Sequence, residues 1–193
     1  GRVVATQRAV FEDLVLDEAE IPAPADEETA RLLLEAASAD PASALSLDGP
    51  AARLRARADF LRRAMPELDL PPLDDEVLRS LLVELVPGRR RLSELRAVPL
   101  EPLLRGRLGP RALRLLDLHA PARLPVPTGR DVTLEYAADG PPVLAVKLQE
   151  LFGLSESPRV ADGRVPVLLH LLSPAGRPVQ VTSDLASFWS RTY

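Results

Sequence analysis

Among the residue types of this sequence, arginine offers the most candidates for a binding site. Of the 24 basic residues, only Lys147 is a lysine. Three arginines are consecutive at 89–91, after a segment with the apolar spacing of a helix, where they are able to reach phosphate oxygens or the last carbonyl groups of that helix. Further arginines follow at short intervals. The candidate nucleic-acid contacts are Arg89, Arg90, Arg91, Arg105, Arg107 and Arg111.

Two interpretations of these arginines stay open. In one they bind a nucleic-acid backbone, whose phosphates supply most of the salt-dependent affinity of such complexes. In the other they form an ordinary solvated surface, enriched because the many Ala, Pro and Arg residues indicate GC-rich coding. The charge distribution restricts the first interpretation to the middle of the chain. Residues 49–125 contain 15 basic and 10 acidic groups, whereas residues 1–48 contain 3 and 11.

Two neighbouring aromatic residues form the second candidate site, an interaction patch at Phe188 and Trp189. They lie in the last expected helix, for which Ser183 and Asp184 are suitable N-caps. We expect Trp189 to anchor this helix, with partner docking or base stacking as the alternatives. All four phenylalanines fall in apolar patterns, which predicts that they are buried: Phe11, Phe60, Phe152 and Phe188.

Catalytic chemistry finds little support in the remaining residues. The chain has no cysteine, which excludes disulfides and thiolate metal sites. His119 and His170 lack the spacing that sets two ligands on one helix face, and we expect both to be structural. The acidic run 74–76 fits the first turn of a helix, with a glycosidase-type carboxylate pair as a minor alternative. The sequence predicts no catalytic residue, no metal site and no cofactor.

The elements that position these residues are helical in the middle of the chain. Apolar residues recur there at helical spacing, and Asp26, Asp48, Asp74 and Ser93 are placed as N-caps. Gly109 separates the last two helices. The expected helices cover residues 27–38, 50–65, 75–86, 93–98, 99–108 and 110–118.

Strands are expected on both sides of this helical region. One or two strands lie within 3–16, and linker-like stretches follow at 21–24 and 124–129. Further strands are expected at 132–136, 165–172 and 178–182, with a turn at 173–176 and a helix at 142–152. The predicted fold class is α+β. It comprises a strand remnant at 1–24, a helical subdomain at 25–120 and a mixed β/α subdomain at 121–193.

Three segments near the C-terminus resemble a known family: PPVLAVKLQELFG at 141–153, RVPVLLHLLSPAGRPVQVT at 164–182 and DLASFW at 184–189. They are similar to the C-terminal end of the HrpB family, bacterial ATP-dependent helicases of the DEAH/RHA type. Residues 2–20 look like the closing strands of the small barrel that precedes this region in the family. The family's proteins normally continue into a short basic, proline-containing tail.

This resemblance implies that the chain is part of a larger protein and contributes to the function of that protein. The parent would be an ATP-dependent RNA helicase that uses ATP and magnesium. The fragment contains neither a G-x-x-x-x-G-K-[ST] P-loop nor a DEAH tetrad, and we expect Lys147 to lie within a helix. We therefore expect a non-catalytic accessory region that supports the helicase core or docks partners, with an arginine-based single-stranded RNA module as the alternative. No signal peptide or membrane span is visible, which fits a cytoplasmic protein.

Overall fold

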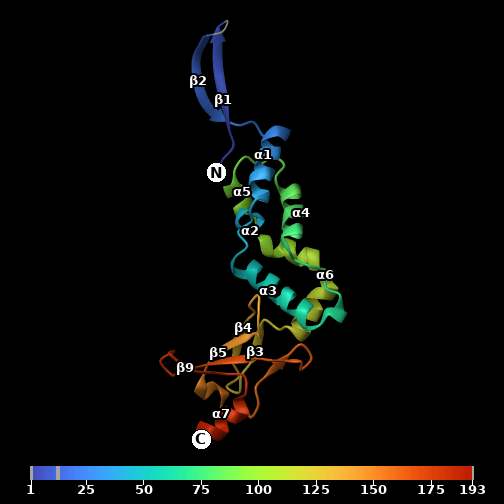
Figure 1. Cartoon of the computed structure of the whole chain (residues 1–193), viewed down its shortest axis with the longest axis vertical. Helices are drawn as coiled ribbons and strands as arrows, with labels where there is room; N and C mark the ends of the chain where they lie inside the picture. Colours follow the sequence, from blue (N-terminus) through green and yellow to red (C-terminus); the bar gives the residue numbers. More distant parts are fainter. Residues whose placement is uncertain (1, 12–13, 193) are drawn as a thin grey trace. The chain divides into compact units, whose positions relative to one another are not determined.

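The protein has the α+β architecture that the sequence predicts. The computed structural model describes residues 2–11 and 14–192 (Figure 1). Its contacts form two compact units, each made of two segments. Unit 1 contains residues 1–48 and 73–103, and unit 2 contains residues 49–72 and 104–193. The division into three consecutive subdomains, at 1–24, 25–120 and 121–193, stays a prediction.

Unit 1 begins with an antiparallel hairpin. Strand β1 (Val4–Phe11) pairs with β2 (Leu14–Pro22), with a bulge between Ala9 and Val10. The second strand therefore includes Ile21 and Pro22, which the sequence had placed in a linker. The backbone N–H of Val3 donates to the carbonyl of Arg90 at 3.1 Å, which fixes the start of the chain to a loop of the same unit. The role of this hairpin in closing a barrel stays a prediction.

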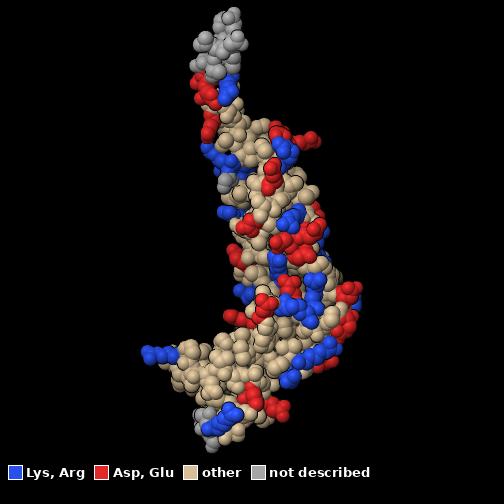
Figure 2. All heavy atoms as spheres, viewed as in Figure 1, with Lys and Arg blue, Asp and Glu red and all other residues tan. Residues whose placement is uncertain are grey.

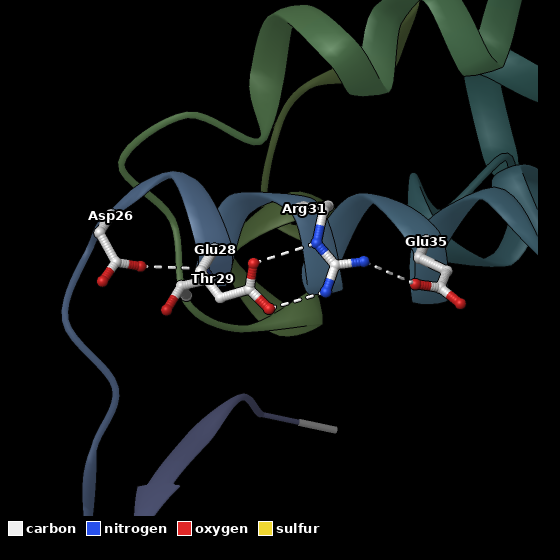
Figure 3. A network of polar contacts seen from close by, with 5 residues as sticks. All are labelled: Asp26, Glu28, Thr29, Arg31 and Glu35. Carbon is white, nitrogen blue, oxygen red and sulfur yellow. Dashed lines mark hydrogen bonds and ion pairs between the residues drawn. The ribbon is translucent and has the colours of Figure 1, made fainter.

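Side-chain caps start the two longer helices of unit 1 where the sequence predicts them. The Asp26 carboxylate accepts from the Thr29 N–H at 2.9 Å and begins α1 (Glu27–Ser38). Figure 3 shows the next turns of α1, where Arg31 lies between Glu28 and Glu35 and pairs with both. Asp74 caps α4 (Asp75–Leu85) in the same way. Such caps satisfy N–H groups that have no partner inside the helix.

Two short helices complete unit 1. Helix α2 (Pro41–Ala44) is capped by Asp40 and was not predicted, although Asp followed by Pro is a helix-start signal. Helix α5 (Leu92–Arg96) begins one residue before Ser93, so the Ser93 cap was wrong. The core of unit 1 is aliphatic because every helix contributes leucine or alanine to it. Its buried side chains include Leu33, Ala37, Leu45, Leu78, Leu81, Leu82 and Leu95.

Helix α3 (Gly49–Ala64) and the part of helix α6 (Leu100–His119) from Leu104 onward precede the sheet of unit 2. Helix α3 is followed by the 3₁₀ turn η1 (Pro66–Leu68). Helix α6 is interrupted at Gly109, whose φ of 73° and ψ of 170° are not helical. The predicted division at Gly109 is confirmed, and Pro110 starts the second segment, where its missing N–H costs nothing.

A five-stranded sheet forms the rest of unit 2, in the order β3-β4-β5-β8-β9. Its central pair, β5 and β8, is parallel, and the other pairs are antiparallel. The chain returns from β5 to β8 through the 3₁₀ turn η2 and the small ladder β6-β7, and helix α7 follows β9. The bounds are β3 (Arg123–Pro125), β4 (Asp131–Glu135), β5 (Val143–Lys147), η2 (Leu148–Leu151), β6 (Arg159–Val160), β7 (Val165–Pro166), β8 (Leu168–Leu172), β9 (Pro178–Thr182) and α7 (Leu185–Thr192).

The expected helix at 142–152 was wrong, because this segment forms β5 and η2. The spacing of apolar residues in this short run fits both a helix and a strand. Pairing with the parallel strand β8 favours the strand. Leu144 and Val146 are buried whereas Ala145 between them is exposed, which is the alternation of a strand. Lys147 consequently lies at the end of a strand and not within a helix. The linker expected at 124–129 likewise contains part of β3.

Charged residues are distributed over the helices without forming a single-sign region on the face drawn in Figure 2, where Lys and Arg alternate with Asp and Glu. Among residues 2–11 and 14–192, the longest helices are too short or too polar to traverse a lipid bilayer.

Candidate functional site

A hollow lined by apolar residues lies on the surface of unit 2, next to the loop that directly follows η2. Its volume is about 390 Å³, and its lining consists of Phe152, Gly153, Leu154, Ser155 and Trp189. We call it the Phe152–Trp189 groove. The lining contains two aromatic rings and no charged side chain, so the groove suits an apolar ligand surface better than an anion.

Local structure fixes the walls of this groove. Gly153 has a φ of 97°, a conformation that turns the chain after η2 and that side chains disfavour. The indole Nε1–H of Trp189 donates to the carbonyl of Leu154 at 2.8 Å. The N–H of Leu185 donates to Ser157 Oγ at 2.9 Å, so the first turn of α7 is bound to the same loop. Both walls are thus positioned before any ligand arrives.

The aromatic residues differ sharply in exposure. Phe152 is 55% exposed and Phe188 is 5% exposed, while Trp189 is half-buried between them. The Trp189 ring centroid lies 5.8 Å from that of Phe152 and 5.1 Å from that of Phe188. Trp189 therefore anchors α7, as expected. The burial predicted for Phe152 was wrong: residues 143–151 form β5 and the 3₁₀ turn η2 in place of the expected helix, and Phe152 follows that turn with its side chain exposed.

A buried carboxylate lies in η2, two residues before Phe152. Glu150 in η2 is 8% exposed and pairs with Arg130 Nη1. Its other oxygen accepts from the backbone N–H of Lys147 at 3.3 Å. These contacts hold η2 against the sheet directly before Phe152. Sequence reasoning missed this pair, because nothing in the spacing of Arg130 and Glu150 indicates contact.

The arginines at 89–91 lie in the loop between α4 and α5 of unit 1. Arg89 Nη1 donates to the carbonyl of Leu85 at the end of α4, so this side chain caps a helix. The backbone N–H groups of Arg90 and Arg91 donate to Glu94 Oε2 at 2.7 and 2.9 Å. These two bonds hold the pKa of Glu94 below its ordinary value. The side chains of Arg90 and Arg91 are exposed.

The other candidate arginines lie on α6, in unit 2. Arg105, Arg107 and Arg111 are exposed, and Arg111 Nη2 donates to the carbonyl of Leu68 at 3.3 Å. The six predicted residues are therefore divided between the two units, three in each. Their contact with nucleic acid stays a prediction.

Arg57 has a structural role within unit 2. It is 9% exposed, and its Nε donates to the carbonyl of Ala120 at 2.8 Å. Its Nη2 contacts Asp117 Oδ1 at 2.9 Å, so one guanidinium joins α3 to the end of α6. Nearby, the hydroxyl of Tyr136 donates to the carbonyl of Pro121 at 2.7 Å, and burial raises the pKa of Tyr136.

The two histidines lie on different elements of unit 2, and their structural role stays a prediction. The carbonyl of His119 accepts from the N–H of Ala161 at 2.7 Å, and His170 lies half-buried within β8. In the part of the chain that the structure describes, no three metal-ligating side chains come together.

Comparison with known proteins extends these observations. A family model described as "ATP-dependent helicase C-terminal" matches residues 81–193. The ATP-dependent RNA helicase HrpB of Escherichia coli (strain K12) is 36% identical over 197 residues, which cover the whole chain and 24% of that protein. The chain thus spans about a quarter of the length of this relative.

Two crystal structures of the same E. coli protein share the fold. The structure titled as a DExH-box NTPase HrpB matches with a TM-score of 0.76 and 35% identity, over 96% of this chain and 23% of that one. The structure titled as a DEAH/RHA helicase HrpB matches with a TM-score of 0.72 and 34% identity, over 96% and 24%. The chain therefore belongs to the HrpB helicase C-terminal family.

Proposed function

We propose that this chain is a non-catalytic accessory region of an ATP-dependent RNA helicase, and that it docks against the remainder of the helicase or a partner protein. The Phe152–Trp189 groove carries this proposal. An exposed aromatic ring beside a fixed tryptophan is the kind of anchor that dominates protein interfaces. The groove lacks charged side chains, which favours a protein surface over nucleic-acid phosphates as its ligand.

The reaction itself is assigned to the remainder of the helicase. ATP binding by a P-loop requires backbone N–H groups around the phosphates and a lysine that reaches the outer phosphates. The lysine of this chain, Lys147, ends strand β5 and no glycine-rich loop precedes it. We expect ATP and magnesium to bind outside residues 1–193, in a protein that acts in the cytoplasm.

Co-purification tests the docking proposal. The chain, fused to an affinity tag, is mixed with the separately expressed remainder of the helicase after treatment with RNase. We expect the remainder to be retained in stoichiometric amount. Loss of retention after RNase treatment would show that RNA bridges the two parts, and the proposal would then be wrong.

A second candidate function is arginine-based binding of single-stranded RNA. Unit 2 contains 16 basic and 11 acidic residues, and Arg105, Arg107 and Arg111 are exposed on its helix α6. Binding to an unstructured RNA should weaken as salt rises, because each phosphate contact releases counterions.

Two sets of substitutions test this candidate. Joint replacement of Arg90 and Arg91 by alanine spares the helix cap at Arg89, and joint replacement at 105, 107 and 111 alters unit 2 alone. Arg79→Ala, on the exposed side of α4, is the matched control. We expect one of the two sets of substitutions to reduce the affinity for RNA. The same set should also reduce the steepness with which that affinity falls as the salt concentration rises. Absence of binding at low salt, or an equal effect of the control, would contradict this function.

A further inference from the structure

Three aspartates of this chain are directly followed by glycine: Asp48, Asp139 and Asp162. In such a pair the backbone nitrogen of the glycine is able to attack the aspartyl side chain, because no Cβ shields that nitrogen. Each of the three glycines has a positive φ, and a Cβ built on it would meet no atom within 4 Å apart from its chain neighbours. Asp139 and Asp162 also lie in the same triplet, Ala-Asp-Gly, at 138–140 and 161–163. A difference in their reactivity therefore comes from what restrains the backbone around each pair.

The loop around Asp139 carries few restraints. It joins β4 to β5, and residues 137–140 are exposed. Among the residues that the structure describes, none forms a hydrogen bond or ion pair with Asp139 or Gly140. The Arg63 Nη2 donates to the carbonyl of Ala137, two residues earlier, over a long distance of 3.4 Å. Backbone with so few contacts opens locally at a small cost in free energy.

The turn around Asp162 is restrained on both sides. It lies between β6 and β7, and the Arg164 N–H donates to the carbonyl of Ala161 at 3.2 Å. The side chain of Arg159 then holds the second half of the turn. Its Nε donates to the carbonyl of Gly163, and its Nη2 donates to the carbonyl of Arg164 at 3.2 Å. Movement of the glycine nitrogen towards the side chain of Asp162 has to break these contacts.

The pair Asp48–Gly49 is restrained by a helix. Gly49 is the first residue of α3, and the N–H of Asp48 donates to the carbonyl of Ser46 at 2.8 Å. Rotation about the bonds between the two residues displaces the start of the helix, which the hydrogen bonds of the helix oppose. Asp139 is thus the aspartate of the three whose backbone moves most easily.

We propose that Asp139 is a site of spontaneous backbone isomerisation, and that it reacts ahead of Asp48 and Asp162. The nitrogen of Gly140 forms a bond to Cγ of Asp139 in its carboxylic-acid form. The amide proton and the Cγ hydroxyl leave as water, which closes a succinimide ring. Water then opens the ring at the main-chain carbonyl, so that the peptide bond runs through Cγ and the α-carboxyl group becomes free. The product is isoaspartate, with no change in mass because the water lost is regained.

The product is accessible to enzymes in the folded chain. The ladder between β4 and β5 pairs Leu134 with Leu144 and Glu135 with Val143, so the added main-chain methylene falls in the exposed loop outside the ladder. A free isoaspartyl α-carboxylate is the substrate class of carboxyl methyltransferases that take the methyl group from S-adenosylmethionine. The methyl ester closes again to the succinimide with loss of methanol, and hydrolysis returns part of it to aspartate. Asp139 is therefore a site of ageing and of enzymatic repair.

Ageing of the 193-residue chain at neutral pH tests the proposal. Isoaspartate at each pair is measured by peptide mapping with a protease that cleaves before aspartate but not before isoaspartate. Transfer of labelled methyl groups by an added isoaspartyl methyltransferase provides a second readout. We expect several-fold more isoaspartate at Asp139 than at Asp48 or Asp162, and none at this position in Asp139→Glu, whose longer side chain closes a ring far more slowly. Equal or faster accumulation at either of the other pairs would overturn the proposal.

Two controls separate the effect of structure from that of sequence. In guanidinium chloride, Asp139 and Asp162 should isomerise at similar rates, because the unfolded triplets are the same. In the folded chain, Arg159→Met removes two bonds of the 161–164 turn and should raise the rate at Asp162 without changing the rate at Asp139. A melting curve verifies that this variant is folded, and the comparison in denaturant does not depend on it. A ranking that persists in denaturant, or a folded Arg159→Met with an unchanged rate at Asp162, would show that the restraints do not control the reaction.

Discussion

Replacement of Phe152 by serine should weaken docking of the remainder of the helicase by about 50- to 100-fold. Phe152 is 55% exposed, and a phenylalanine side chain buries roughly 200 Å². A partner that covers the exposed part removes about 110 Å² of apolar surface from water, which stabilises the complex by about 2.8 kcal/mol at ~25 cal/mol per Å². Each 1.4 kcal/mol changes the dissociation constant about tenfold.

The same substitution should affect folding much less than binding. Phe152 contacts the Trp189 ring at a centroid distance of 5.8 Å, and such aromatic pairs contribute about 0.5–1.5 kcal/mol. The Trp189–Leu154 hydrogen bond and the Glu150–Arg130 pair do not depend on the Phe152 side chain. The free energy of unfolding should therefore fall by about 1 kcal/mol, which leaves the chain folded.

Isothermal titration calorimetry with the remainder of the helicase measures this effect. Leu118→Ser is the matched control, because Leu118 is 72% exposed and lies outside the groove. The control should change neither affinity nor stability by more than about 0.5 kcal/mol. Unchanged affinity for Phe152→Ser, or an equal loss for both variants, would refute the assignment of the groove as the docking site.

Three further predictions concern stability. Trp189→Phe removes the hydrogen bond to Leu154 and should lower the free energy of unfolding by about 1 kcal/mol in urea titrations, with α7 as the first element to lose protection in hydrogen exchange. Arg57→Met leaves the Ala120 carbonyl without its donor and should cost about 2–3 kcal/mol by the same titration. The hydrogen bond from Arg164 holds the pKa of Glu67 below its ordinary value of 4.5, so this pair stabilises the fold above that pH and its contribution is lost as the pH falls through the lowered pKa. The melting temperature of Glu67→Gln should accordingly fall less on acidification than that of the wild type, and an identical pH profile would contradict the prediction.

Local chemistry explains why the helices were predictable from the sequence. Asp26 and Asp74 begin their helices because each carboxylate accepts from an N–H three residues further on, a contact that needs no distant residue. Gly109 interrupts α6 for an equally local reason, its left-handed φ of 73°. The turn at Ser173–Gly176 forms as expected, with the Gly176 N–H donating to the Ser173 carbonyl.

Non-local pairing explains the principal error. Residues 143–152 have apolar spacing that suits a helix, but β5 forms because β8, about 25 residues further along, offers a parallel partner. A parallel register is set by the tertiary fold and leaves no short-range signal in the sequence. The exposure of Phe152 follows from this single difference. The groove was therefore half predictable, since Trp189 was expected at the site and Phe152 was expected in the core.

Ionic contacts in which one partner is buried were unpredictable for a related reason. Arg57 meets Asp117, and Arg130 meets Glu150, across 60 and 20 residues respectively. A sequence rich in arginine gives many candidates for each such contact and no means of choosing between them. The structure separates the arginines by burial. Arg57 maintains the fold, whereas Arg90 and Arg91 stay exposed and available for a ligand.

The division of charge between the units decides which arginines are best suited to RNA. Unit 1 contains 8 basic and 17 acidic residues, so the exposed arginines of the 89–91 loop lie in a strongly acidic unit. Unit 2 contains 16 basic and 11 acidic residues, and the arginines at 105, 107 and 111 lie there. Because a phosphate backbone responds to the summed field as well as to single contacts, acidic neighbours weaken the first group more than the second. If the chain binds RNA, its contacts should therefore concentrate on α6, although the run at 89–91 is the denser cluster in the sequence.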